Sequence, residues 1–116
     1  MKDPSCLFCR IVSREIPADI VHETENTIAF RDIAPQAPVH VLVIPKEHVT
    51  SLATIPDNSE ALLGQLMAAV RDVASIEGLE DSGFRTVLNT GPDGGQEVMH
   101  LHAHVLGGRE LVWPPG

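Results

Sequence analysis

Residues 98–106 read Val-Met-His-Leu-His-Ala-His-Val-Leu, with histidines at every second position: His100, His102 and His104. Side chains two residues apart in a β-strand project from the same face of the sheet. An extended 98–106 segment therefore places three imidazoles side by side. It sends the alternating apolar residues into the core: Leu101, Ala103 and Val105. We expect a strand over 98–106, preceded by a glycine-rich loop over 91–96.

Four further segments rich in β-branched and apolar residues are expected to form strands: 20–24, 27–32, 39–44 and 84–89. Glu25-Asn26 separates the first two by the spacing typical of a tight hairpin. The prolines of 34–38 predict a loop, and Pro45 ends the strand that follows it.

Two helices are expected. The short one spans about 6–13, with Asp3 or Ser5 as its cap and Ile16-Pro17 as its stop. The long one spans 59–77, begins at a cap among 57–59, and ends at Gly78. Hairpin-like strands with few helical crossovers favour the α+β class: a five-stranded antiparallel sheet with one long and one short helix, the long helix covering one face.

The composition predicts a single domain over 1–116. The chain has 116 residues, of which 43% are hydrophobic and 21% charged, with a net charge of -8. This charge opposes binding to nucleic acids, which are not expected as partners. No apolar run approaches the ~20 residues of a membrane span and the N-terminus is unlike a secretory signal, so we expect a cytoplasmic protein without a membrane partner.

The histidine segment predicts one of two chemistries. A neutral imidazole is a good nucleophile toward phosphorus, and the glycine-rich loop with Asn89 offers N–H donors to a phosphate. Alternatively, three histidines can bind a catalytic metal. The spacing alone does not separate these two sites.

The pattern His-φ-His-φ-His-φ-φ of residues 100–106, where φ is apolar, resembles the histidine triad (HIT) family. Further segments are similar to the Hint branch of histidine triad nucleotide-binding proteins, in its bacterial type with a CxxC pair: 30–40, 43–46, Asn89 with 94–96, 107–109 and 113–116. The resemblance covers almost the entire chain. It implies a HIT-like fold over 1–116.

The resemblance also implies a function, a purine nucleoside phosphoramidase or nucleotidyl hydrolase. Such an enzyme cleaves adenosine 5'-phosphoramidate-type substrates, for example AMP-lysine or an aminoacyl adenylate, to AMP through a covalent nucleotidyl-histidine. The resemblance assigns the nucleophile to His102, the phosphate contacts to His104 and Asn89, and orienting roles to His40 and His100. No cofactor is required for this chemistry.

The rest of the implied nucleotide site surrounds these residues. Asp32 would hold the ribose hydroxyls, because a carboxylate accepts two hydrogen bonds. Gly95 and Gln96 would cradle the phosphate. An apolar base pocket would use Phe8, Ile11, Ile20, Phe30 and Ile33. Glu97 departs from eukaryotic members, which commonly carry serine; we expect its carboxylate to point away from phosphate and its N–H to remain a donor.

Cys6-x-x-Cys9 supplies two ligands of a zinc site, whereas a closed structural site needs four. His48 and His100 could complete the set, as in related proteins of the family. A structural Zn²⁺ is therefore expected, with two buried apolar thiols as the alternative. If His100 binds zinc, its imidazole is not free to relay protons.

The resemblance implies a homodimer in which the tail with Trp113 reaches the partner's site. Two rival functions remain: a non-catalytic purine nucleotide-binding or interaction protein, and a metal-dependent enzyme that uses all three histidines. A dinucleoside polyphosphate hydrolase is a further alternative, which the Hint-like ending Gly107-Gly108-Arg109 disfavours.

Overall fold

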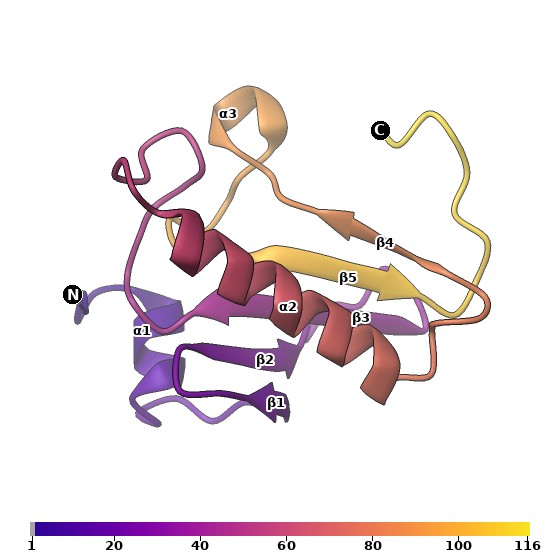
Figure 1. Ribbon diagram of the computed structural model, residues 1–116, viewed down its shortest axis with the longest axis horizontal. Coiled ribbons are helices and arrows are strands. Elements are labelled where there is room, and N and C mark those ends of the chain that lie inside the picture. Colours follow the sequence, from indigo (N-terminus) through magenta and orange to yellow (C-terminus); the bar gives the residue numbers. More distant parts are fainter. Residues whose placement is uncertain (1) are drawn as a thin grey trace.

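Five strands form one antiparallel sheet in the order β1-β2-β3-β5-β4 (Figure 1). The structure is a computed structural model that describes residues 2–116. Its elements are α1 (Leu7–Val12), β1 (Ile20–Glu23), β2 (Thr27–Arg31), β3 (Val39–Pro45), α2 (Glu60–Ile76), β4 (Phe84–Val87), α3 (Gly91–Gly94) and β5 (Ala103–Gly107). The predicted α+β fold with a five-stranded antiparallel sheet is confirmed.

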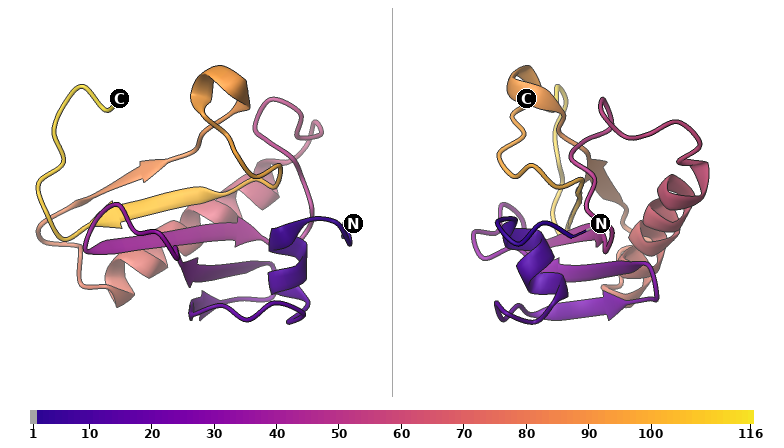
Figure 2. Two further views of the ribbon diagram at one scale, coloured as in Figure 1. Left: turned by 180° about the vertical axis from the view of Figure 1, so that it is seen from behind. Right: turned by 90° about the vertical axis from the view of Figure 1, so that its left-hand side faces the viewer.

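The two helices α1 and α2 lie on opposite faces of the sheet (Figure 2). Beneath α2, alternating residues of the central strands β3 and β5 pack against the helix: Val41, Val43, Ala103 and Val105. The helix contributes Leu66, Val70 and Val73 to the same core. The opposite face carries a smaller core beside α1: Phe8, Ile11, Ile28, Phe30, Leu42 and Ile44. Leu101, Ala103 and Val105 are no more than 2% exposed, as the alternation predicted.

The long helix α2 ends in a Schellman motif. Gly78 has φ 72°, its N–H donates to Ser75 O at 3.1 Å, and Leu79 N–H donates to Ala74 O at 2.9 Å. Ser59 is the N-cap residue, within the predicted range. Within residues 2–116, no helix is both long and apolar enough to cross a membrane.

The cap predicted for α1 is wrong. Cys6, rather than Asp3 or Ser5, is the N-cap, and its Sγ accepts a hydrogen bond from Cys9 N–H at 3.4 Å. Asp3 instead accepts from Ser5 N–H at 2.9 Å, so these two residues form a turn before the helix. The helix therefore starts with both cysteines in its first turn.

The predicted strand over 98–106 is also too long, because β5 begins at Ala103. The backbone before it is bonded elsewhere. Leu101 N–H donates to Val49 O at 2.7 Å, and His100 O accepts from the His102 ring at 2.7 Å. Pro45, at the end of β3, has no N–H with which to extend the ladder. Only His104 of the three histidines therefore lies in a strand.

The predicted loop over 91–96 contains a short helix, α3, in place of irregular backbone. Its first residue, Gly91, and its C-cap residue, Gly95, have φ of 70° and 77°, a region that favours glycine. The helix stands away from the five strands, beyond the edge strand β4 (Figure 1).

Candidate active site and metal centre

A cavity of about 360 Å³ opens on the face of the sheet opposite α2. Its walls come from segments far apart in the sequence: Phe8, Asp32, Ala34, Gln36, His40, Leu42, Asn89, Gly95, Glu97, Val98, His102 and His104. Most residues predicted for catalysis and phosphate binding therefore meet in one place.

His102 is oriented as a nucleophile would need to be. Its ring is 7% exposed, and its Nδ1 lies 2.7 Å from His100 O. A carbonyl oxygen only accepts, so Nδ1 carries the proton and the lone pair is on Nε2. Phe8 packs against this ring in an edge arrangement, with the two centroids 5.3 Å apart. The protein thus fixes both the tautomer and the plane of the imidazole.

A second hydrogen-bond chain fixes the tautomers of His40 and His104. The main-chain N–H of Gln36 donates to His40 Nδ1 at 3.0 Å, so the His40 proton is on Nε2. His40 Nε2–H in turn donates to His104 Nδ1 at 2.9 Å. The remaining proton of His104 must therefore be on Nε2, where it is available as a donor.

Burial keeps both of these histidines neutral. It lowers the pKa of His104 to about 4, with further lowering from His102 and His40. Burial also lowers the pKa of His40. Asp32 Oδ2 lies 3.5 Å from His40 Nε2, but a neutral imidazole makes this a polar contact instead of an ion pair. The Asp32 carboxylate also accepts from Ala34 N–H through Oδ1, at 2.8 Å.

Of the main-chain donors predicted for the α3 loop, the Glu97 N–H is available, whereas those of Gly95 and Gln96 are not. The N–H groups of Gly95 and Gln96 already donate within the loop, to Pro92 O at 3.1 Å and Gly91 O at 3.0 Å. Glu97 and Val98 line the cavity, and within residues 2–116 no hydrogen bond engages their N–H groups. These two amides are the loop's available donors for an anion, beside the half-buried Asn89.

The residues predicted for the base pocket are dispersed. Phe8 lines the cavity. The Phe30 ring packs against the Phe8 ring, with the two ring centroids 5.4 Å apart. Ile11 and Ile20 line a separate cavity of about 300 Å³. Ile33 is fully exposed, at 101%. The base pocket therefore stays a prediction.

Gln36 is a site residue that the sequence did not reveal. It acts through its main-chain N–H, which any non-proline residue possesses, so its side chain carries no signal. Only its place in the loop before β3 brings it to His40.

The cysteine pair forms a second centre with two histidines. Cys6 Sγ, Cys9 Sγ, one ring nitrogen of His48 and one of His100 all lie within 4.8 Å of one another. His100 Nε2 is 2.9 Å from Pro45 O and must donate to it, which leaves the Nδ1 lone pair facing the cysteines. Burial raises the pKa of the Cys9 thiol. Two sulfurs and two imidazole nitrogens match the tetrahedral set that Zn²⁺ prefers.

The hypothesis of one metal bound by all three histidines is wrong. The His100 ring faces the cysteines, whereas His102 and His104 line the cavity. Asp32, His40 and His104 also lie within 4.8 Å of one another. However, His40 accepts at Nδ1 and donates from Nε2, so its neutral ring has no free lone pair for a metal.

Comparison with known proteins identifies the family. A model of the HIT domain matches residues 13–111. The chain belongs to the HIT domain family. The 14 kDa zinc-binding protein of Zea mays is 48% identical over 118 residues, covering 100% of this chain and 91% of that protein.

Two solved structures of the HIT family extend the comparison. A HIT family hydrolase from Legionella pneumophila has a TM-score of 0.94 and 48% identity, covering 97% of this chain and 100% of that chain. A histidine triad nucleotide-binding protein from Candida albicans has a TM-score of 0.79 and 36% identity, covering 87% and 73%.

Proposed function

We propose that this HIT protein is a hydrolase that cleaves purine nucleoside 5'-phosphoramidates to the nucleoside monophosphate. The observation that carries the proposal is the His102 tautomer: Nδ1–H is held by His100 O, and the Nε2 lone pair is free in a ring that lines the cavity. The Legionella relative is named as a hydrolase, which supports the reaction class. The Candida relative is named as a nucleotide-binding protein, which supports a nucleotide as the ligand.

The reaction proceeds by two displacements at phosphorus. His102 Nε2 attacks the α-phosphorus, an Nε2–P bond forms, and the bond to the leaving amine breaks. The amine nitrogen takes a proton from solvent water as it departs, and the water that later attacks phosphorus returns one proton to the solvent. The modified imidazole is then positively charged, and His100 O stabilises it through the Nδ1–H bond. Water attacks the phosphorus, the Nε2–P bond breaks, and AMP is released.

Neighbouring groups position the nucleotide. His104 Nε2–H and Asn89 donate to phosphate oxygens, together with the free main-chain N–H groups of the α3 loop. The carboxylate of Asp32 at the cavity wall accepts from the ribose hydroxyls. These donors are neutral and preorganised, so they stabilise charge that develops on phosphorus oxygens without reorganising.

Steady-state hydrolysis of an adenosine 5'-phosphoramidate tests the proposal. His102→Ala is expected to abolish turnover while AMP binding, measured by calorimetry, persists. His22→Ala is the matched control, because His22 lies on β1 outside the cavity. Near-normal hydrolysis by His102→Ala would show that His102 is not the nucleophile. AMP binding without any hydrolysis by the natural protein would favour the non-catalytic nucleotide-binding function.

A structural Zn²⁺ is part of the proposal. The four candidate ligands leave no position for water in a tetrahedral site, and the name of the maize relative records zinc binding. Bound zinc would fix the start of α1 to the segment that precedes β5. Metal analysis of purified protein should give one zinc per chain. A value well below one, after growth with added zinc, would refute the site.

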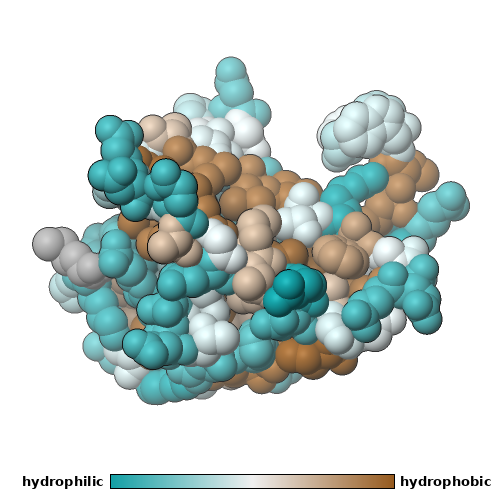
Figure 3. Space-filling model, viewed as in Figure 1, coloured by the Kyte–Doolittle hydropathy of each residue, from teal (hydrophilic) through white to brown (hydrophobic). Residues whose placement is uncertain are grey.

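We also propose a homodimer. Strand β4 is an edge of the sheet, and Figure 3 shows hydrophobic surface between α2 and β4. Phe84 and Met67 are 41% and 42% exposed. The tail beyond β5 is held where Arg85 donates to Val112 O at 2.9 Å, and the adjacent Trp113 is 80% exposed. Burying these groups against a second copy removes apolar surface from water. Light scattering that shows only a 12.5 kDa species at micromolar concentration would refute the dimer.

A further inference from the structure

The cavity is unusual in its charge for a site that receives a phosphate. Asp32 and Glu97 both line it, and none of its lining residues within 2–116 is lysine or arginine. Phosphate sites commonly use such cations. Here the protein supplies neutral donors to the phosphate, so a positive group carried by the substrate meets no competing lysine or arginine among the described residues of the cavity wall.

Most basic side chains of the protein already have partners and do not line the cavity. Several form ion pairs: Arg10 with Glu15, Arg14 and Lys46 with Glu23, Arg31 with Glu77, and Arg71 with Asp72. Arg85 and Arg109 donate to main-chain carbonyls. None of these seven side chains is among the residues that line the cavity. They therefore leave the carboxylates of the cavity without a local cation.

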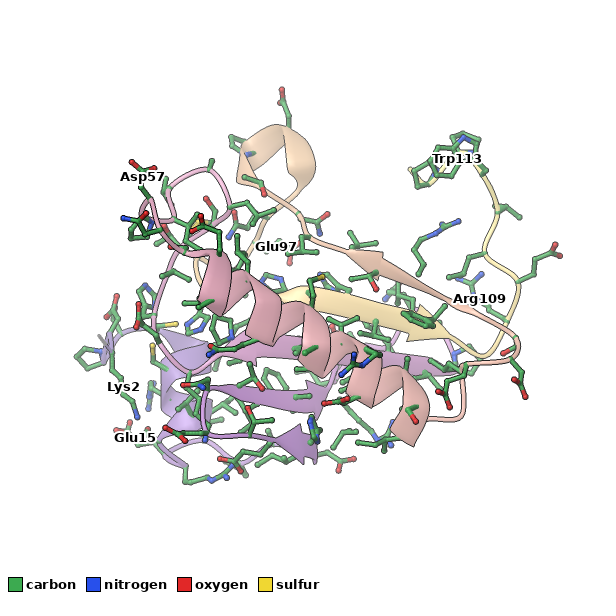
Figure 4. All side chains as sticks on the ribbon, viewed as in Figure 1. Lys2, Glu15, Asp57, Glu97, Arg109 and Trp113 are labelled. Carbon is green, nitrogen blue, oxygen red and sulfur yellow. The ribbon has the colours of Figure 1, made fainter. Side chains whose placement is uncertain are left out.

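The two carboxylates differ in their bonding. Asp32 is engaged by Ala34 N–H at 2.8 Å and lies beside His40. Glu97 is exposed, and within residues 2–116 no hydrogen bond or ion pair engages its carboxylate. It lies between α3 and β5 (Figure 4). The Asp32 carboxylate is thus hydrogen-bonded to a neighbouring residue, whereas the Glu97 carboxylate has no bonded partner in the part of the chain that the structure describes.

The backbone that carries Glu97 is held firmly at the cavity. The preceding side chain, Gln96, is 9% exposed and bonded at both ends of its amide. Its Nε2 donates to Thr50 O at 2.7 Å and to Val98 O at 3.0 Å, while Oε1 accepts from Gly91 N–H at 3.1 Å. A carboxylate without a bonded partner within residues 2–116 is therefore carried by a fixed backbone at the cavity wall.

We propose that Glu97 selects the leaving group by charge: it favours phosphoramidates whose leaving amine carries a second, cationic group and disfavours those whose leaving group is anionic. This rests on the proposed phosphoramidase function. A solvent-exposed carboxylate without a paired cation attracts a cation and repels an anion within several ångströms, and each interaction changes a rate by about fivefold. Polyphosphate leaving groups are disfavoured for the same reason.

The test uses three adenosine 5'-phosphoramidates with the same two-carbon leaving amine. The amine ends in trimethylammonium, methoxy or sulfonate, so it is cationic, neutral or anionic. The measured quantity is the ratio of kcat/KM for the cationic substrate to kcat/KM for the anionic one. Comparing this ratio between natural protein and Glu97→Gln cancels the intrinsic reactivities of the three amines.

Glu97→Gln is expected to lower the ratio at least tenfold, and the ratio of the natural protein should fall with added salt. Asp93→Asn is the matched control, because it removes one charge from exposed α3 outside the cavity lining. An unchanged ratio in Glu97→Gln, or an equal change in Asp93→Asn, overturns the inference while hydrolysis of the neutral substrate upholds the proposed function. Failure of the natural protein to hydrolyse any of the three overturns both. Thermal unfolding of each variant checks that it is folded.

Discussion

Replacing His40 should impair the reaction through the tautomer of His104. His40→Leu removes the Nε2–H that donates to His104 Nδ1 at 2.9 Å. In the productive tautomer, His104 Nδ1 then becomes a buried acceptor without a partner, which costs about 1–3 kcal/mol. The imidazole lowers this cost by moving its proton to Nδ1, because an Nδ1–H can donate to the Asp32 carboxylate, which lies within 4.8 Å of the His104 ring. The productive tautomer is depleted by about 5- to 150-fold, since 1.4 kcal/mol corresponds to a factor of ten.

The loss should therefore be one to two orders of magnitude in kcat for an adenosine 5'-phosphoramidate. His40→Gln supplies an amide N–H at a similar reach and should recover part of that activity. His22→Gln controls for loss of a histidine outside the cavity. Long-range ¹H–¹⁵N NMR of the ring nitrogens reads the His104 tautomer directly. Full activity in His40→Leu, or lost activity with an unchanged His104 tautomer, would refute the reasoning.

Three more predictions follow from particular contacts. Gly108→Ala should lower the free energy of unfolding by about 2–4 kcal/mol in a urea titration. The reason is that Gly108 has φ 89° and that an added Cβ would lie 2.8 Å from Pro38 Cβ. Gly64→Ala is the control, because Gly64 has open space on α2 and its replacement should be neutral or stabilising. Zinc removal by chelator should lower the free energy of unfolding by about 4 kcal/mol relative to protein held at a free zinc concentration a thousandfold above its Kd, and identical melting curves would contradict the metal site. Because the pKa of His104 is lowered to about 4, the unfolded chain binds its proton first. The contribution of His104 to stability should be complete above about pH 6.5 and fall by up to about 3 kcal/mol as the pH drops to 4, and His104→Gln should remove this part of the pH dependence.

The fold could be predicted from the sequence because its elements are regular where their hydrophobic periodicity is regular. The segment 39–44 is rich in β-branched residues and forms β3, and Gly78 marks the end of α2. The error at β5 has a different origin. Alternation predicts which side chains face the core, and Leu101 does, but it does not reveal that the His100 carbonyl is bonded to a side chain instead of to the neighbouring strand.

The candidate site was predictable in its side chains and not in its main-chain donors. The spacing of the histidines singled out the segment 100–104, and the resemblance to the HIT family assigned roles to His102 and Asp32; both line the cavity. The N–H of Gln36 and the free amides after Gln96 carry no such signature. Their availability depends on which carbonyls the α3 turn has already satisfied, and that is a property of tertiary structure.

His100 joins the two centres through different atoms, which removes the apparent conflict between metal binding and catalysis. Its imidazole is shared between Pro45 O and the cysteine cluster, and its carbonyl accepts from His102 Nδ1–H. A proton relay through the His100 ring is therefore unnecessary for the nucleophile. Because the ring and the carbonyl belong to one residue that is 0% exposed, a ligand that fixes the ring also restricts the peptide plane that orients His102. Loss of metal should accordingly weaken the reaction through the angle of the His102 ring, even where the nucleotide pocket itself is intact.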